Sequence, residues 1–202
     1  VADIKQGLDQ IADRYEASAI VLGKHDNSIF ENIFGSKAID LVESMHHPFI
    51  VLQHKMTNDP ITNILFAFNH QRESLQATQM VSSLAKLHGA KIHLAPYPEY
   101  DDDLNNEVKI NEKLIVDHLM AHDIPFEMAE VPRGTLYKSM LISYAHRNDV
   151  DLMAAAYLDF GPESMFQSFI DDLLMYDPEI PLMTVNGPEV MIHQTKLDYV
   201  PS

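Results

Sequence analysis

The chain has 202 residues, of which 46% are hydrophobic and 22% are charged, so it has the composition of a globular protein with one large domain, or one domain and a smaller part. It contains no cysteine, which excludes disulfide frameworks, thiolate metal sites and cysteine nucleophiles. Its net charge of −16 disfavours nucleic acid as a partner, and no apolar run approaches the roughly 20 residues that span a bilayer. With no cysteine and no secretion signal, we expect a cytoplasmic protein that does not engage the membrane.

The first part of the chain predicts two helix–strand pairs. The continuous apolar runs Ala19–Leu22 and Phe49–Leu52 are typical of strands that are buried on both faces. Each run follows a stretch with helical spacing of apolar residues, from Ile4 to Tyr15 and from Ile33 to Val42. The polar segment that begins at Gln53 predicts a linker up to residue 60.

After the linker, strands and helices alternate without interruption. We expect strands at 61–68, 91–95, 126–131, 151–157 and 182–185, with helices at 73–87, 101–121, 135–147 and 163–175. Apolar strands that alternate with helices are typical of an α/β fold with a doubly wound, Rossmann-like parallel sheet, here of five strands. Residues 187–202 have no clear period and are expected to form a tail.

The two parts of the chain are related by an internal repeat. The constant shift that places Pro48 on Pro181, here called the repeat offset, also places Ala12 on Ala145. The order of helix, strand, loop, helix and strand repeats without a gap. We therefore interpret residues 1–54 as the C-terminal half of a first domain, residues 61–186 as a complete second domain and residues 187–202 as a C-terminal tail.

Short motifs in both parts resemble the universal stress protein family. The first part has an apolar strand followed by Gly23-Lys24-His25-Asp26, then Gly35-Ser36, then a strand that starts after His47-Pro48. This order resembles the end of a universal stress protein domain. In the second part Asn69 stands where the family has an Asp at the end of its first strand, and Gly89-Ala90 and Gly134 also resemble family positions.

The resemblance implies a nucleotide site outside the carboxyl ends of the first and fourth strands of a domain. There a polar side chain binds adenine, and a glycine-rich loop and a Gly-Ser helix start bind phosphate oxygens. The residues that match this pattern are Gly23, His25, Gly35 and Ser36, with Asp26 in place of a glycine, and Asn69 in the second part.

In the second part this implied site is degenerate. Asn69 replaces the Asp, and the loop from Ala156 to Asp159 lacks glycine and places a carboxylate where phosphate would bind. We therefore expect a non-enzymatic regulatory or interaction module of the stress response, with no cofactor. The alternative is a stress protein that binds adenine nucleotide (ATP) through the loop from Gly23 to Ser36.

Two apolar strands, 49–52 and 182–185, are expected at sheet edges. The resemblance implies antiparallel pairing of such strands, either between two copies of the chain or inside one chain as a pseudo-dimer. The strand 19–22 would then keep an open side, so we expect self-association or cover from another segment. The sequence names no further protein partner.

Other polar clusters have simpler explanations than a site. His118 and His122 have the spacing of a metal-binding pair, but histidines are also favoured near a helix C-terminus, and we expect no metal site. Asp101-Asp102-Asp103 is expected to begin a helix. The chain has no nucleophile elbow, P-loop or HExxH motif.

Overall fold

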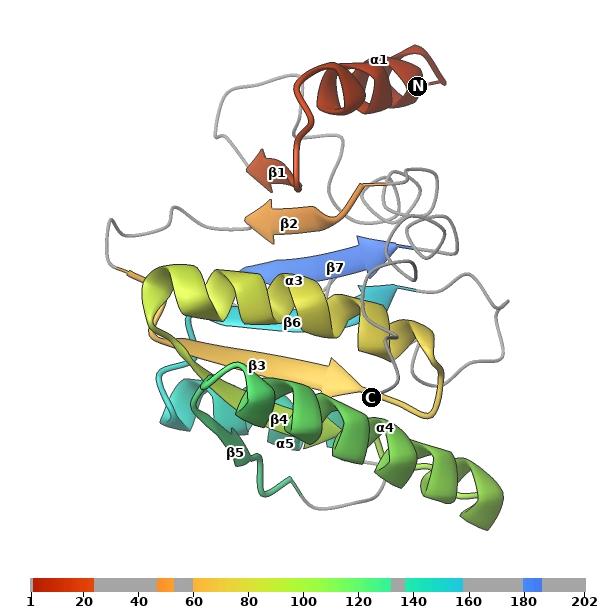
Figure 1. The fold of residues 1–202 in the computed structure, drawn as a ribbon, viewed down its shortest axis with the longest axis vertical. Coiled ribbons are helices and arrows are strands. Elements are labelled where there is room, and N and C mark those ends of the chain that lie inside the picture. The colour runs from red at the N-terminus through yellow and green to blue at the C-terminus, as the bar shows by residue number, and fades with distance from the viewer. Residues whose placement is uncertain (1, 24–46, 53–59, 132–136, 158–179, 187–202) are drawn as a thin grey trace, which may run out of the picture.

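Seven strands form one sheet in the order β1-β2-β7-β6-β3-β4-β5 (Figure 1). The computed structural model describes residues 2–23, 47–52, 60–131, 137–157 and 180–186. The strands are β1 Ile20–Gly23, β2 Phe49–Leu52, β3 Asn63–Phe68, β4 Lys91–Pro96, β5 Phe126–Met128, β6 Leu152–Tyr157 and β7 Leu182–Asn186. The helices are α1 Ala2–Arg14, α3 Glu73–His88, α4 Asp102–Ala121 and α5 Tyr137–Arg147.

The five strands β7-β6-β3-β4-β5 are all parallel, which confirms the predicted doubly wound sheet of the second part. The strand β5 is shorter than the predicted range 126–131. The amide of Val131 bonds to the carbonyl oxygen of Ala129 at 2.9 Å, so the chain turns there instead of continuing the ladder with β4. The expected helices at 33–42 and 163–175, and the tail, lie outside the described residues.

Strand β2 pairs with β7 in antiparallel register, with Phe49 opposite Thr184 and Ile50 opposite Met183. Figure 1 shows the arrows of β1 and β2 pointing against those of β7 and β3. The predicted antiparallel pairing of 49–52 with 182–185 is therefore present within one chain. This ladder joins the parallel pair β1–β2 to the parallel block of five strands.

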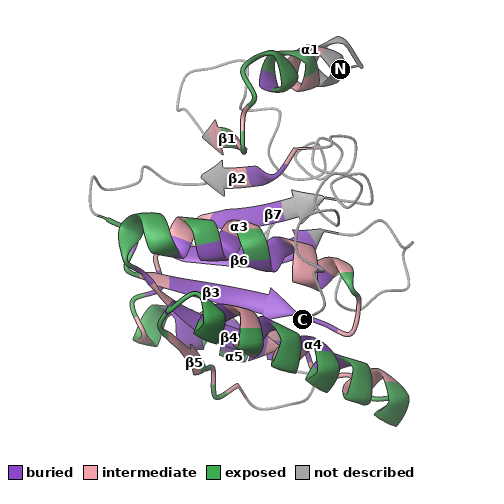
Figure 2. Cartoon of the chain, viewed as in Figure 1, coloured by how far each residue is buried: buried purple, intermediate pink, exposed green. Residues whose placement is uncertain are grey.

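Helices cover the sheet on two faces, and a core lies under each layer. Helices α3 and α4 lie on one face, and α5 lies on the other (Figure 1). Alternate residues of β3 serve the two cores, since Ile64 and Phe66 pack in one cluster while Leu65 packs in the other. The central strands, such as β3 and β6, are the most buried elements, and the outer helix faces are the most exposed (Figure 2). Within the described residues, none of the helices is both long and apolar enough to cross a membrane.

Two predicted helix ends are confirmed by their local geometry. Helix α3 ends at Gly89, whose φ of 70° is the left-handed conformation that glycine adopts most easily. Helix α4 begins after Asp101, whose carboxylate accepts from the amides of Asp103 and Leu104 at 2.9 and 3.0 Å. The acidic run is thus a helix cap.

Two pieces of the sheet that are related by the repeat offset have the same geometry. Ile20 pairs with Phe49 in β1–β2, and Met153 pairs with Leu182 in β6–β7. The amide of Ile20 bonds to the oxygen of Pro48 at 2.8 Å, and the amide of Met153 bonds to that of Pro181 at 2.9 Å. The repeat offset therefore places Ile20 on Met153 and Phe49 on Leu182, with equivalent pairing in both ladders.

The turns that lead into β1 and β6 also agree at this offset. Glu16 has a φ of 49° and Asp149 a φ of 48°, both in the left-handed region where residues other than glycine are uncommon. The amide of Ala17 bonds back to Ala12 at 2.9 Å, as the amide of Val150 does to Ala145 at 3.0 Å.

We predict that Phe49→Ala lowers the free energy of unfolding by about 3–5 kcal/mol, because Phe49 is fully buried at the β2–β7 joint and its loss leaves a cavity. Val21→Ala on the neighbouring strand is the matched control, with an expected change of about 0.5 kcal/mol or less because Val21 is 57% exposed. Urea denaturation of the two variants measures both values. Equal effects would show that the joint is not packed as described.

Candidate functional site

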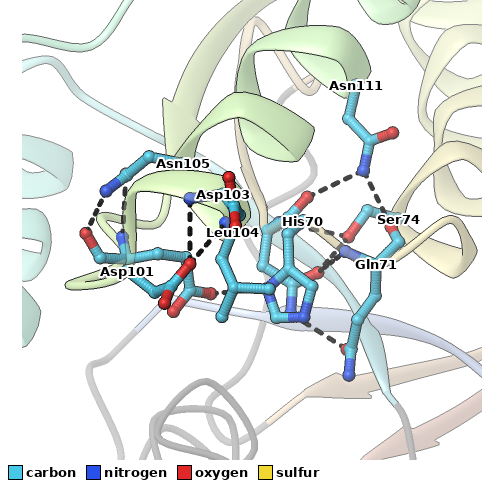
Figure 3. A network of polar contacts seen from close by, with 10 residues as sticks. His70, Gln71, Ser74, Asp101, Asp103, Leu104, Asn105 and Asn111 are labelled. Atoms are coloured by element: carbon cyan, nitrogen blue, oxygen red, sulfur yellow. Dashed lines mark hydrogen bonds and ion pairs between the residues drawn. The ribbon is translucent and has the colours of Figure 1, made fainter.

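A network of polar side chains, which includes Gln71, Ser74 and Asn111, lies beyond the carboxyl ends of β3 and β4 (Figure 3). Asn69 is hydrogen-bonded to Gln71 and to Ser74. Asn69 directly follows β3 and is fully buried. Its Oδ1 accepts from the amide of Gln71 at 3.1 Å and from the hydroxyl of Ser74 at 2.8 Å. Its Nδ2 donates to Oε1 of Gln71 at 2.9 Å. The amide group of Asn69 is therefore directed at its own loop and at the first turn of α3.

Helix α4 holds the same loop from the side. Asn111, which is buried on α4, donates from Nδ2 to the carbonyl oxygens of Asn69 and Gln71 at 2.9 and 3.0 Å. Asn105 accepts from the amide of Glu99 at 3.2 Å and donates to the carbonyl oxygen of the same residue. Two asparagines of one helix thus fix the loops that follow β3 and β4.

An ion pair joins these two loops. Nδ1 of His70 lies 2.8 Å from Oε1 of Glu99, and the two side chains are 27% and 15% exposed. Both side chains are therefore largely buried between the loops. Ser74 directs its hydroxyl proton at an amide oxygen, not at a base, so it is not prepared as a nucleophile. The contact between His70 and Glu99 and the hydrogen bonds of Asn69 order the two loops.

The structure places the sequence-predicted site residues in two separate regions. Gly23 is the last residue of β1, and Asn69 follows β3. Because β1 runs antiparallel to β3, these two residues lie at opposite ends of the strands of the sheet. His25, Asp26, Gly35 and Ser36 lie outside the described residues, and so do Gly134 and Asp159.

The histidine pair of α4 borders a groove between α3 and α4. The rings of His118 and His122 are 4.2 Å apart, and Nδ1 of His122 donates to the carbonyl oxygen of His118 at 2.8 Å. Burial, the neighbouring His122 and Lys86 lower the pKa of His118. In the described part of the chain, no three His, Asp or Glu side chains gather as metal ligands would.

A second polar network lies at the amino ends of β3 and β4, around His93. Its ring is almost fully buried, with Nε2 3.1 Å from Oδ1 of Asn63 and Nδ1 2.9 Å from the hydroxyl of Tyr144. Glu127 lies 3.0 Å from Nδ1 and is held by Lys91 at 3.0 Å. Burial lowers the pKa of His93, and the opposing attraction to Glu127 only partly offsets this effect.

Asn111 and His93 are not among the site residues predicted from the sequence. The helical period of α4 indicates that Asn111 is buried, because it lies at helical spacing between Val108 and Ile115, which are both buried. A polar residue on the buried face of a helix needs a hydrogen-bond partner, and this requirement points to a constrained loop nearby. His93 alternates with apolar residues in a strand, so its burial was readable but its partners were not.

No protein-family model matches this sequence, and no curated protein matches it. Solved structures do match. A universal stress protein from Archaeoglobus fulgidus DSM 4304 superposes with a TM-score of 0.68 at 16% identity, over 90% of this chain and 66% of that one. A putative universal stress protein from Pseudomonas aeruginosa UCBPP-PA14 has a TM-score of 0.55 at 13% identity, over 92% of this chain and 69% of that one.

The sheet order and the two helical layers define a doubly wound α/β protein. Together with the two superpositions, they show that the chain has the fold of the universal stress proteins. This chain spans about two thirds of the length of the Archaeoglobus structure.

We predict that Asn69→Ala destabilises the protein by about 1–3 kcal/mol, since it leaves the hydroxyl of Ser74 and the amide of Gln71 without their buried acceptor. Asn106→Ala, at an exposed position of α4, is the control and should change stability by about 0.5 kcal/mol or less. Chemical denaturation compares the two. A neutral Asn69→Ala would mean that the loop does not depend on this amide.

We predict that the free energy of unfolding decreases as the pH falls below 6.5, because His93 has a lowered pKa in the folded protein. The unfolded chain binds a proton at His93 near pH 6.5, whereas the folded chain binds it only at lower pH, so the stability present above pH 6.5 is lost as the pH falls towards the folded pKa. The slope is at most about 1.4 kcal/mol per pH unit for one proton.

Urea denaturation at pH 7.5 and 5.5, compared with His93→Gln, isolates this contribution from that of the other histidines. An unchanged pH dependence in His93→Gln would contradict the assignment.

Proposed function

We propose that this chain is a universal stress protein that acts in the stress response as a regulatory or interaction module, without catalysis of its own. The fold supports this proposal. We further propose that residues 1–54 are the C-terminal half of a first domain, that residues 61–186 are a complete second domain and that residues 187–202 are a tail. The equal register and equal turn geometry at the repeat offset support this division.

The main observation that supports this proposal is that the side-chain amide of Asn69 is buried and hydrogen-bonded within its own loop. The family resemblance assigns adenine recognition to the residue at this position. Here that residue is fully buried and its amide is hydrogen-bonded to Gln71 and Ser74. An adenine ring would have to displace these bonds, each of which costs about 1–3 kcal/mol when its buried partner is left unpaired. The nucleotide site of residues 61–186 is therefore proposed to be degenerate.

The interaction role rests on strand pairing. A backbone ladder between β2 and β7 recognises extended chain and needs no special side chains. We propose that this type of pairing links universal stress units, inside the chain as an internal pseudo-dimer and between chains as self-association. A cytoplasmic location and a protein partner belong to the same proposal.

A second candidate function is the binding of ATP by the first part of the chain. One observation favours it: Gly23 ends β1, as the family pattern requires for a loop that approaches phosphates closely. The site would use His25, Asp26, Gly35 and Ser36 as well. The two candidates differ in a single property, the affinity for adenine nucleotide.

We predict that 1 mM ATP, ADP or AMP, with and without magnesium, leaves the melting temperature unchanged within about 1 °C. A ligand present at 100 times its Kd would instead stabilise the fold by about 2.7 kcal/mol, which raises the melting temperature of a protein of this size by about 5–10 °C. Differential scanning fluorimetry measures the shift.

A rise of several degrees that Gly35→Asp abolishes would overturn the proposal in favour of the ATP-binding candidate. A rise that persists in Gly35→Asp but disappears in Asn69→Ala would show that the second part binds nucleotide after all.

A further inference from the structure

The strand β1 has a neighbour on one side only. It pairs with β2, and in the described part of the chain no strand lies beyond it. Apolar side chains next to this open edge face solvent. Val21 of β1 is 57% exposed, and Ile11 of the adjoining helix α1 is 55% exposed. Exposed apolar strands at a sheet edge are a liability that proteins normally cover.

The same chain shows how the equivalent edge is covered elsewhere. At the repeat offset Val21 corresponds to Ala154, which is 1% exposed, and Ile11 corresponds to Tyr144, which is 8% exposed. Strand β6, the equivalent of β1, pairs in parallel with β3, so that Ala154 lies opposite Phe66. Ala154 also packs in the core under α3, which lies on this face of the sheet (Figure 1).

A second copy of β1 would not cover this edge in the way that β3 and α3 cover β6. In a symmetric dimer β1 would pair with β1 in antiparallel direction over four residues. In such a dimer the one described helix beside β1 is α1, whose Leu8 packs in the core of Leu22 and not on the face that carries Val21. The geometry of β6 requires both a strand and a helix, and the strand must be parallel.

We propose that the open edge of β1 is a docking site for a parallel β-strand followed by an amphipathic helix, a strand–helix segment of the universal stress type that takes the place that β3 and α3 take beside β6. This inference rests on the proposed duplication and goes beyond it, because it specifies the partner segment and its direction. The incoming strand pairs with Ile20–Gly23. Its helix covers Val21, and the strand that follows this helix covers Ile11, as β4 contacts Tyr144 through His93.

Side-chain volume defines the segment further. Strand β1 presents Val21 and Leu22 where β6 presents Ala154 and Ala155. Close packing then calls for side chains smaller than that of Phe66 opposite Val21. The partner strand is thus apolar, with β-branched or small residues at this register.

The test uses the whole chain and the fact that it has no cysteine. Val21→Cys places a single thiol at the open edge, and Ser143→Cys places one on the exposed face of α5 as the control. Each variant is made with and without a second copy of residues 60–133 joined in front of Val1. Val1 corresponds to Gly134 at the repeat offset, so the added β3 is as far in sequence from α1 as the original β3 is from α5. The rate of reaction with a maleimide is then compared with and without the added copy.

We expect the added copy to slow the reaction at position 21 by about tenfold or more, since a thiol under a paired strand and a helix reacts only after local opening, and to leave position 143 unchanged. A second version of the added copy carries Phe66→Val to relieve crowding. A third carries Leu65→Pro, which cannot join the centre of a sheet and should restore the fast reaction.

An unchanged rate at position 21 in both the unaltered and the Phe66→Val versions, with the melting transition of the original chain intact, would overturn the proposal. So would a slow reaction of the chain without the added copy that accompanies a dimer mass in sedimentation, because a second copy would then be the occupant. None of these readouts depends on nucleotide binding, so failure here is distinct from failure of the proposed function.

Discussion

The backbone ladder between β2 and β7 is the interaction on which the rest of the structure depends. It turns two groups of parallel strands into a single sheet, so that β7 and β2 cease to be edges. A buried amide or carbonyl without a partner costs as much as a lost hydrogen bond, and each apolar strand must therefore find a neighbour. The joint satisfies this requirement for β2 and for β7 at once, and it brings Phe49 into the same core as Leu182.

The polar loops beyond β3 and β4 show a second constraint. Asn69, Ser74 and Asn111 are all buried, and a buried amide is tolerated only when its donors and acceptors are satisfied. The protein meets this condition with its own groups. Because the same atoms cannot also bind a ligand without losing their partners, a ligand at these loops would compete with the internal hydrogen bonds of Asn69 and Asn111.

The alternation of apolar runs with helical periods was enough to predict the parallel sheet, because burial on both faces leaves a continuous signal in each strand. Gly89 and Asp101 marked helix ends for local chemical reasons that act within a few residues. The early end of β5 was not predictable in this way, since it depends on a turn bond made by Val131. The hydrogen-bond partners of Asn111 are 40 and 42 residues away in sequence and those of His93 are 30 and 51 residues away, beyond the reach of any local period. Candidate site residues could therefore be chosen by motif, as Asn69 was, but whether such a residue is free to bind or engaged in its own loop is decided by tertiary contacts.

The joint between β2 and β7 has a consequence for how such a chain can change over evolutionary time. A ladder of main-chain amides and carbonyls is indifferent to most substitutions, provided that the strands stay apolar and free of proline. The polar side chains around Asn69 lie in loops at the strand ends, away from the joint. Mutations can therefore accumulate in the loops of one unit without separating it from the other, so that one half of such a protein is free to specialise or lose a ligand while the assembly is inherited intact.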